Sequence, residues 1–78
     1  MTPNQAHQAV WKGQGPPAID RVDPPHLQGE QWHAHLAPGM GSIAVNRDGT
    51  WRHLPAGRQP PTLTKAQITF LKEAGWNL

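Results

Sequence analysis

The chain has no cysteine among its 78 residues. No disulfide can therefore join its segments, no thiolate can serve as a nucleophile or metal ligand, and cysteine usage gives no indication of the redox compartment. No apolar run approaches the ~20 residues that span a bilayer, and the N-terminus lacks the basic-then-apolar pattern of a signal peptide. These absences exclude thiol enzymes and predict a chain with no membrane partner.

Several catalytic signatures are absent as well. The sequence has no carboxylate pair, no glycine-rich phosphate loop before a helix and no Gly-x-Ser-x-Gly elbow. Seven lysines and arginines against five acidic residues give a net charge of +2, and the basic residues are scattered along the chain. That charge is compatible with an anionic partner such as RNA, and no basic run marks a nucleic-acid site.

The length predicts one small domain, residues 1–78, which buries only ~60% of the surface that its unfolded chain exposes. Four tryptophans and one phenylalanine are expected to supply much of the core. An N-terminal helix is predicted over residues 1–12, with Thr2 as N-cap, Pro3 at its first position and Gly13 just beyond its end. Its inward residues should be Ala6, Val10 and Trp11.

A C-terminal helix is predicted over residues 64–74. Thr64 and Gln67 form a capping box, and Leu71 lies on an apolar stripe at helical spacing. Gly75 supplies the left-handed stop. These signals agree on a structural role for this helix.

Residues 18–54, between the helices, are predicted to form an antiparallel sheet. Residues 18–22 alternate as a strand does, although Ile19 and Val22 cannot share one face of a regular strand. Strict alternation over residues 31–36 predicts the next strand. It places Gln31, His33 and His35 on a polar face and Trp32, Ala34 and Leu36 toward the core. The linker 37–41 is expected to be a tight turn or the rim of a site.

A hairpin is predicted next, because apolar-alternating runs flank a turn that has Gly49 where a left-handed residue is needed. Asn46 and Thr50 should close this turn. Thr50 and Arg52 then point away from the core. The opposed pairs would be Val45 with Trp51, Ala44 with Arg52 and Ile43 with His53, with Trp51 and His53 in phase with the core.

Together these elements predict an α+β domain, in which the N-terminal and C-terminal helices pack on one face of a small antiparallel sheet of three to four strands. The other face should be wet and is the natural location for function. Small basic domains carry surface histidines without a task, and His7 and His26 fit that description. His33 and His35 form a denser arrangement, because two titratable rings share one strand face beside Arg52.

One chemistry open to these rings is metal binding. Two imidazoles that are two residues apart on a strand can converge on one zinc ion. A His-x-His pair needs a third ligand, and the candidates are Asp48, His53 and His26. None of the three has diagnostic spacing.

The other chemistry is acid–base cleavage of a phosphodiester, in which His33 and His35 exchange protons near neutral pH. Arg52 or Arg58 would neutralise charge on the phosphorane, and Thr50 would donate a hydrogen bond to a phosphoryl oxygen. Such an enzyme needs no metal and no other cofactor. The remaining candidate for catalysis is His53, and the candidates for substrate binding are Arg58, Lys12 and Asn46.

Three segments, QWHAHL at 31–36, AVNRDGTWRH at 44–53 and LTKAQITFLKEAGWNL at 63–78, carry a family likeness. In this order they resemble the small C-terminal toxin modules of bacterial polymorphic toxins, especially the colicin-type and related ribonuclease toxins, over residues 13–78. The resemblance implies a metal-independent endoribonuclease that acts on RNA, for example tRNA, and is neutralised by a cognate immunity protein. The matching positions are His33, His35, Asn46, Asp48, Gly49, Thr50, Trp51 and His53.

The resemblance further implies secretion, or delivery into the cytoplasm of a target bacterium. Such modules normally end a much longer chain, whereas this sequence begins with Met1, and a free-standing relative would be cytoplasmic. A second functional class is a non-catalytic protein-binding or inhibitor module. Exposure of Trp32 or Trp76 would favour that class.

Overall fold

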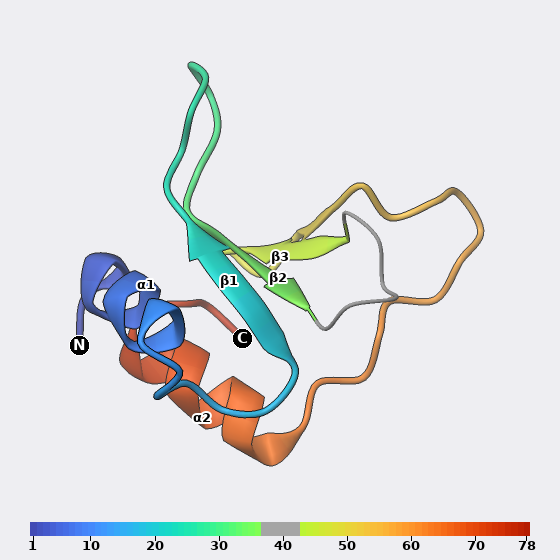
Figure 1. Cartoon of the computed structure of the whole chain (residues 1–78). Coiled ribbons are helices and arrows are strands. Elements are labelled where there is room, and N and C mark those ends of the chain that lie inside the picture. The colour runs from blue at the N-terminus through green and yellow to red at the C-terminus, as the bar shows by residue number, and fades with distance from the viewer. Residues whose placement is uncertain (37–42) are drawn as a thin grey trace.

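In the computed structural model, which describes residues 1–36 and 43–78, two helices pack on one face of a four-stranded antiparallel sheet (Figure 1). The elements are α1 (Pro3–Trp11), β1 (Ile19–Asp23), β2 (His33–Leu36), β3 (Ala44–Asn46), β4 (Trp51–Arg52) and α2 (Lys65–Glu73). Because the strand order is β1-β2-β3-β4, the sheet is a simple meander. The predicted α+β class is confirmed, and the predicted linker 37–41 lies outside the described residues.

Both helices begin and end at the predicted signals. Thr2 and Thr64 each accept a hydrogen bond from the backbone N–H three residues on, and the glutamine at that position completes a capping box. Just beyond the helices, Gly13 and Gly75 adopt φ angles of +75° and +99°, which only glycine adopts without strain. Within the described residues, no helix is long and apolar enough to cross a membrane.

The hairpin has the predicted register, since Val45 pairs with Trp51 and Ala44 with Arg52. The N–H of Asn46 donates to the carbonyl of Thr50 at 2.7 Å, which closes the turn. Two adjacent strands of the sheet are therefore aligned by a turn that the sequence encodes locally.

His53 does not face the core as predicted. It is exposed, and β4 ends one residue earlier, at Arg52. The φ angle of His53 is +58°, which turns the chain out of the sheet before a pair with Ile43 can form.

A β-bulge in β1 brings Ile19 and Val22 onto the same face. Ile19 pairs with Leu36 but Arg21 pairs with His35, so β1 has one residue more than β2 across this interval. Both apolar side chains are consequently buried in the core. The bulge also places Arg21 and Asp23 on the opposite face.

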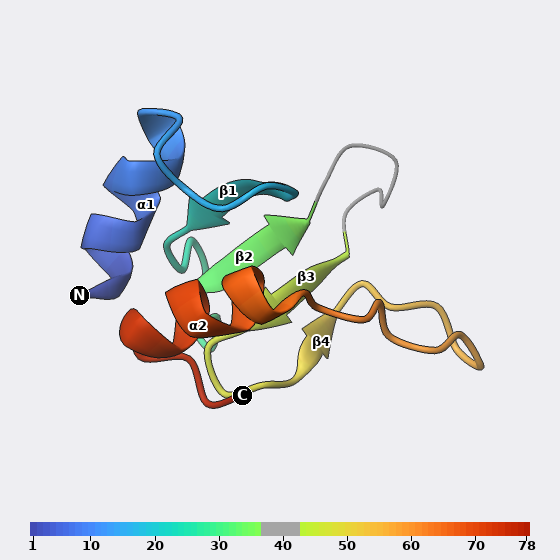
Figure 2. The same ribbon diagram turned by 90° about the horizontal axis from the view of Figure 1, so that it is seen from below.

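The core lies between the sheet and the two helices and is built mainly from small aliphatic side chains (Figure 2). Its members are Ala6, Ile19, Val22, Ala34, Val45, Leu71, Ala74 and Trp76. The Trp76 indole donates to the Val45 carbonyl at 3.1 Å. The aromatic residues contribute less than predicted, because Trp32, Trp51 and Phe70 are only partly buried.

Trp11 is not an inward residue of α1, since it is 82% exposed. Ala6 is fully buried in the core. Five residues of α-helix turn through roughly 500°, which places Trp11 about 140° around the helix from Ala6. The predicted inward direction of Trp11 is therefore wrong.

Candidate active site on the polar face of the sheet

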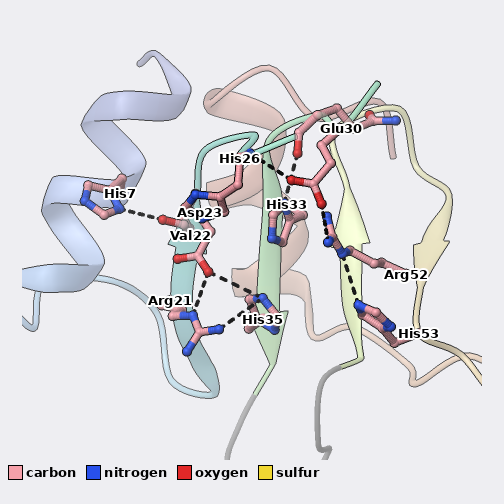
Figure 3. Close-up of polar contacts among 11 residues, drawn as sticks. His7, Arg21, Val22, Asp23, His26, Glu30, His33, His35, Arg52 and His53 are labelled. Carbon is pink, nitrogen blue, oxygen red and sulfur yellow. Dashed lines mark hydrogen bonds and ion pairs between the residues drawn. The ribbon is translucent and has the colours of Figure 1, made fainter. Parts of the chain in front are cut away.

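Among the described residues, the face of the sheet opposite the helices carries six polar residues from all four strands. Figure 3 shows all of them except Asn46. We call this set the polar face: Arg21, Asp23, His33, His35, Asn46 and Arg52. Directly opposed residues of antiparallel strands point to the same side of a sheet. His33 is paired with Asp23 on one side and with Asn46 on the other. His35 is paired with Arg21 and Ala44 in the same way, and Ala44 is paired in turn with Arg52. The histidine strand and the hairpin therefore present their polar residues on one side.

The two central imidazoles touch each other edge to face. The ring centroids of His33 and His35 are 5.1 Å apart, with an interplanar angle of 70°. Nδ1 of His33 lies 2.9 Å from the carbonyl oxygen of Gln31 and must donate to it, which leaves Nε2 without this proton in the neutral ring. Nε2 of His35 lies 3.5 Å both from a carboxylate oxygen of Asp23 and from a guanidinium nitrogen of Arg21.

The expectation of a wet face is wrong at these two rings, because His33 is only 3% and His35 only 8% exposed. Side chains of the neighbouring strand β1 contribute to this burial, since the Arg21 guanidinium lies against the edge of the His35 ring. Burial lowers the pKa of His35, and the positive charge of Arg21 lowers it further. His35 is therefore neutral near pH 7 and able to accept a proton.

Arg52 is held over the polar face by Glu30, a residue that the sequence did not single out. The Arg52 guanidinium pairs with the Glu30 carboxylate, and its Nε lies 3.3 Å from Nε2 of His53. Glu30 also accepts hydrogen bonds from the backbone N–H groups of His26 and Leu27, at 2.7 and 2.9 Å. The His26 N–H, the Arg52 side chain and the Leu27 N–H, in that order of effect, lower the pKa of Glu30 to about 2.

A small polar cavity of about 190 Å³ opens beside this pair. It is lined by Gly29, Glu30, Gln31, Asn46 and Arg52. Asn46, a predicted substrate-binding residue, thus lines the cavity and is also paired with His33 in the sheet.

Three predicted site residues, Thr50, Lys12 and Arg58, form no hydrogen bond or ion pair with the two central histidines. The Thr50 hydroxyl donates to the Asp48 carboxylate at 2.6 Å, so it stabilises the turn and lowers the pKa of Asp48. Lys12 caps α1, which packs on the helical side of the sheet. Arg58 is exposed in the connection between β4 and α2, and no hydrogen bond or ion pair among the described residues joins its side chain to the polar face.

Three potential metal ligands lie close together, but the third is not one of the predicted ligands. The potential ligand atoms of Asp23, His33 and His35 all lie within 4.8 Å of one another. Asp48 is engaged by the turn, and His53 contacts Arg52 instead. Asp23 takes their place because β1 pairs beside β2 in this register.

Sequence reasoning missed Arg21, Asp23 and Glu30 as members of the site. The alternation of Arg21 and Asp23 along a short strand was a usable signal, since it puts both on one face. The sequence did not reveal which strand would lie next to His33 and His35. No sequence pattern indicated the role of Glu30, because its partners are backbone groups of the preceding loop and Arg52 on a strand distant in the sequence.

No protein-family model, curated protein or solved structure matches this chain.

Proposed function

We propose that the chain is a metal-independent endoribonuclease that cleaves RNA by acid–base catalysis with His33 and His35. The observation that carries this proposal is the direct contact of two imidazoles on a face that also holds two arginines. Paired histidines next to cations suit RNA, because its 2′-hydroxyl supplies an internal nucleophile.

In the proposed reaction, neutral His35 accepts the proton of the ribose 2′-hydroxyl. The 2′-oxygen then forms a bond to phosphorus while the bond from phosphorus to the 5′-oxygen breaks. Protonated His33 donates a proton from Nε2 to that leaving oxygen. The products are a 2′,3′-cyclic phosphate and a 5′-hydroxyl, and Arg21 and Arg52 offset charge on the phosphorane.

RNA reaches the buried rings only if a side chain moves aside. Arg21 is suited to this movement, because its side chain is 59% exposed and its contacts are with Asp23 and His35. A phosphate group of the RNA can replace the Asp23 carboxylate as the partner of the Arg21 guanidinium, because it accepts charge-assisted hydrogen bonds as a carboxylate does. Arg21 would thus uncover Nε2 of His35 as the substrate binds.

The biological setting we propose is that of a toxin delivered into a rival bacterium and neutralised by an immunity protein. The support is the resemblance of the three quoted segments to ribonuclease toxin modules. Expression of the chain should arrest a bacterial host, and His35→Gln should relieve the arrest.

The test of the activity is incubation of the purified protein with total RNA, with and without a chelator. We expect discrete fragments ending in a 2′,3′-cyclic phosphate, at the same rate in both samples. His26→Ala is the matched control, because His26 has an exposed side chain outside the polar face. Absence of cleavage, or its loss on chelation, would contradict the proposal.

A non-catalytic protein-binding module is the second candidate. Trp76, whose exposure would have favoured it, is buried, and Trp32 is half-buried. The observation in its favour is instead the 82% exposure of Trp11. If host arrest survives His35→Gln but is lost in Trp11→Ala, binding and not catalysis is the function.

A further inference from the structure

We infer that Asp23, His33 and His35 also form a binding site for a divalent transition metal ion, with Zn²⁺ the best match, in competition with RNA. Ligand atoms of a tetrahedral zinc ion stand roughly 3.4 Å apart, given bonds of about 2.0–2.2 Å. Nε2 of His35 and Oδ2 of Asp23 are 3.5 Å apart, so this edge already has the required length. The other ligand atoms lie within 4.8 Å, so the remaining edges close with shifts of at most roughly 1.4 Å.

His33 is oriented for metal binding by its own backbone. Its Nδ1–H donates to the Gln31 carbonyl at 2.9 Å, which leaves Nε2 as the nitrogen with an available lone pair. Histidines that bind metals commonly donate their other ring N–H to such a carbonyl or carboxylate. Two imidazoles and one carboxylate form a ligand set that zinc accepts, with a fourth position left for water.

Arg21 is the group that opposes the metal. Its Nε lies 2.7 Å from the same Asp23 oxygen that faces His35, so a cation has to displace it. The exposed Arg21 side chain can turn into solvent. Arg52, the other cation on this face, pairs with Glu30 and not with a residue of the metal site. Removal of the Arg21 charge should therefore tighten metal binding.

Metal occupancy has a functional consequence, which rests on the proposed ribonuclease activity. A bound Zn²⁺ occupies the lone pairs of both imidazoles, so neither can take or give a proton. Zinc should then inhibit cleavage, and a chelator should restore it.

The decisive experiment measures Zn²⁺ binding by competition with a chromophoric chelator, using purified protein without RNA. We expect one ion per chain. Asp23→Asn and His35→Gln should weaken binding at least ~10-fold, since loss of an outer partner alone often costs that much. Arg21→Gln should bind more tightly than the wild type, and His26→Ala should match the wild type.

Melting curves recorded with and without Zn²⁺ give an independent readout. At the same Zn²⁺ concentration, the ion should raise the melting temperature of the wild type more than that of Asp23→Asn, which preserves the size of the side chain. The proposed metal site would be overturned if the wild type bound no Zn²⁺. It would also be overturned if Asp23→Asn kept the wild-type affinity for Zn²⁺, or if Arg21→Gln bound the ion more weakly than the wild type. Zinc binding by a chain that cleaves no RNA even after a chelator has removed the metal would refute the proposed function and leave the metal site standing.

Discussion

His33 and His35 differ from ordinary surface histidines because each ring is buried and has polar partners. Replacing either with glutamine should lower RNA cleavage by ~10²- to 10⁴-fold, the usual contribution of a general acid or base. Cleavage rate and melting temperature should be measured on the same samples. A variant that is folded and fully active would remove that histidine from the mechanism, and His53 beside Arg52 would replace it as the candidate.

Glu30 makes a second residue-level prediction, about stability and pH. Its folded-state pKa of about 2 lies below the ordinary value of 4.5. A carboxylate of this kind contributes stability above its unfolded pKa and loses the contribution as pH falls toward its folded pKa. The wild type should therefore melt at a higher temperature than Glu30→Gln at pH 6, and the difference should vanish between pH 4.5 and 2. A difference that is constant down to pH 2 would refute the role assigned to the Glu30 ion pair.

Among the elements, α2 contributes Leu71, a fully buried residue of the core. Leu71→Ala should cost ~2–5 kcal/mol in the free energy of unfolding, as large-to-small core changes do. Trp51→Ala should cost less than Leu71→Ala, because Trp51 is only half-buried on β4. Chemical denaturation would measure both, with the exposed Trp11→Ala as the control, expected within ±0.5 kcal/mol. Equal stability of Leu71→Ala and the wild type would contradict this packing.

The sequence predicted those elements whose determinants are local. N-cap threonines and following glycines located both helices, and the Gly49 turn determined the register of β3 with β4. The failures involve long-range packing. Burial of His35 depends on side chains of β1, and the pairing of β1 with β2 depends on a bulge that alternation alone does not reveal.

At the scale of the whole molecule, charge predicts how RNA binding responds to salt. Arg21 and Arg52 are the cations on the polar face, whereas Lys12 and Arg58 lie elsewhere. Two phosphate contacts on a single strand predict a slope of log K against log salt of about −1.4, at about −0.7 per contact. Arg21→Gln should make the slope shallower by about 0.7. Titration of a labelled oligonucleotide at several salt concentrations measures it, and a wild-type slope near zero would exclude phosphate contacts.

The meander order of the sheet has a consequence for the folding kinetics. Each strand pairs with its neighbour in sequence, so the sheet forms through short loop closures. The docking of α2 is different, because Gln67 donates to the carbonyls of Pro17 and Ala18, about 50 positions earlier. We expect docking to follow sheet formation, so Leu71→Ala should mainly accelerate unfolding, whereas Val45→Ala should mainly slow folding. Stopped-flow measurements would show this, and the reverse pattern would mean that α2 belongs to the folding nucleus.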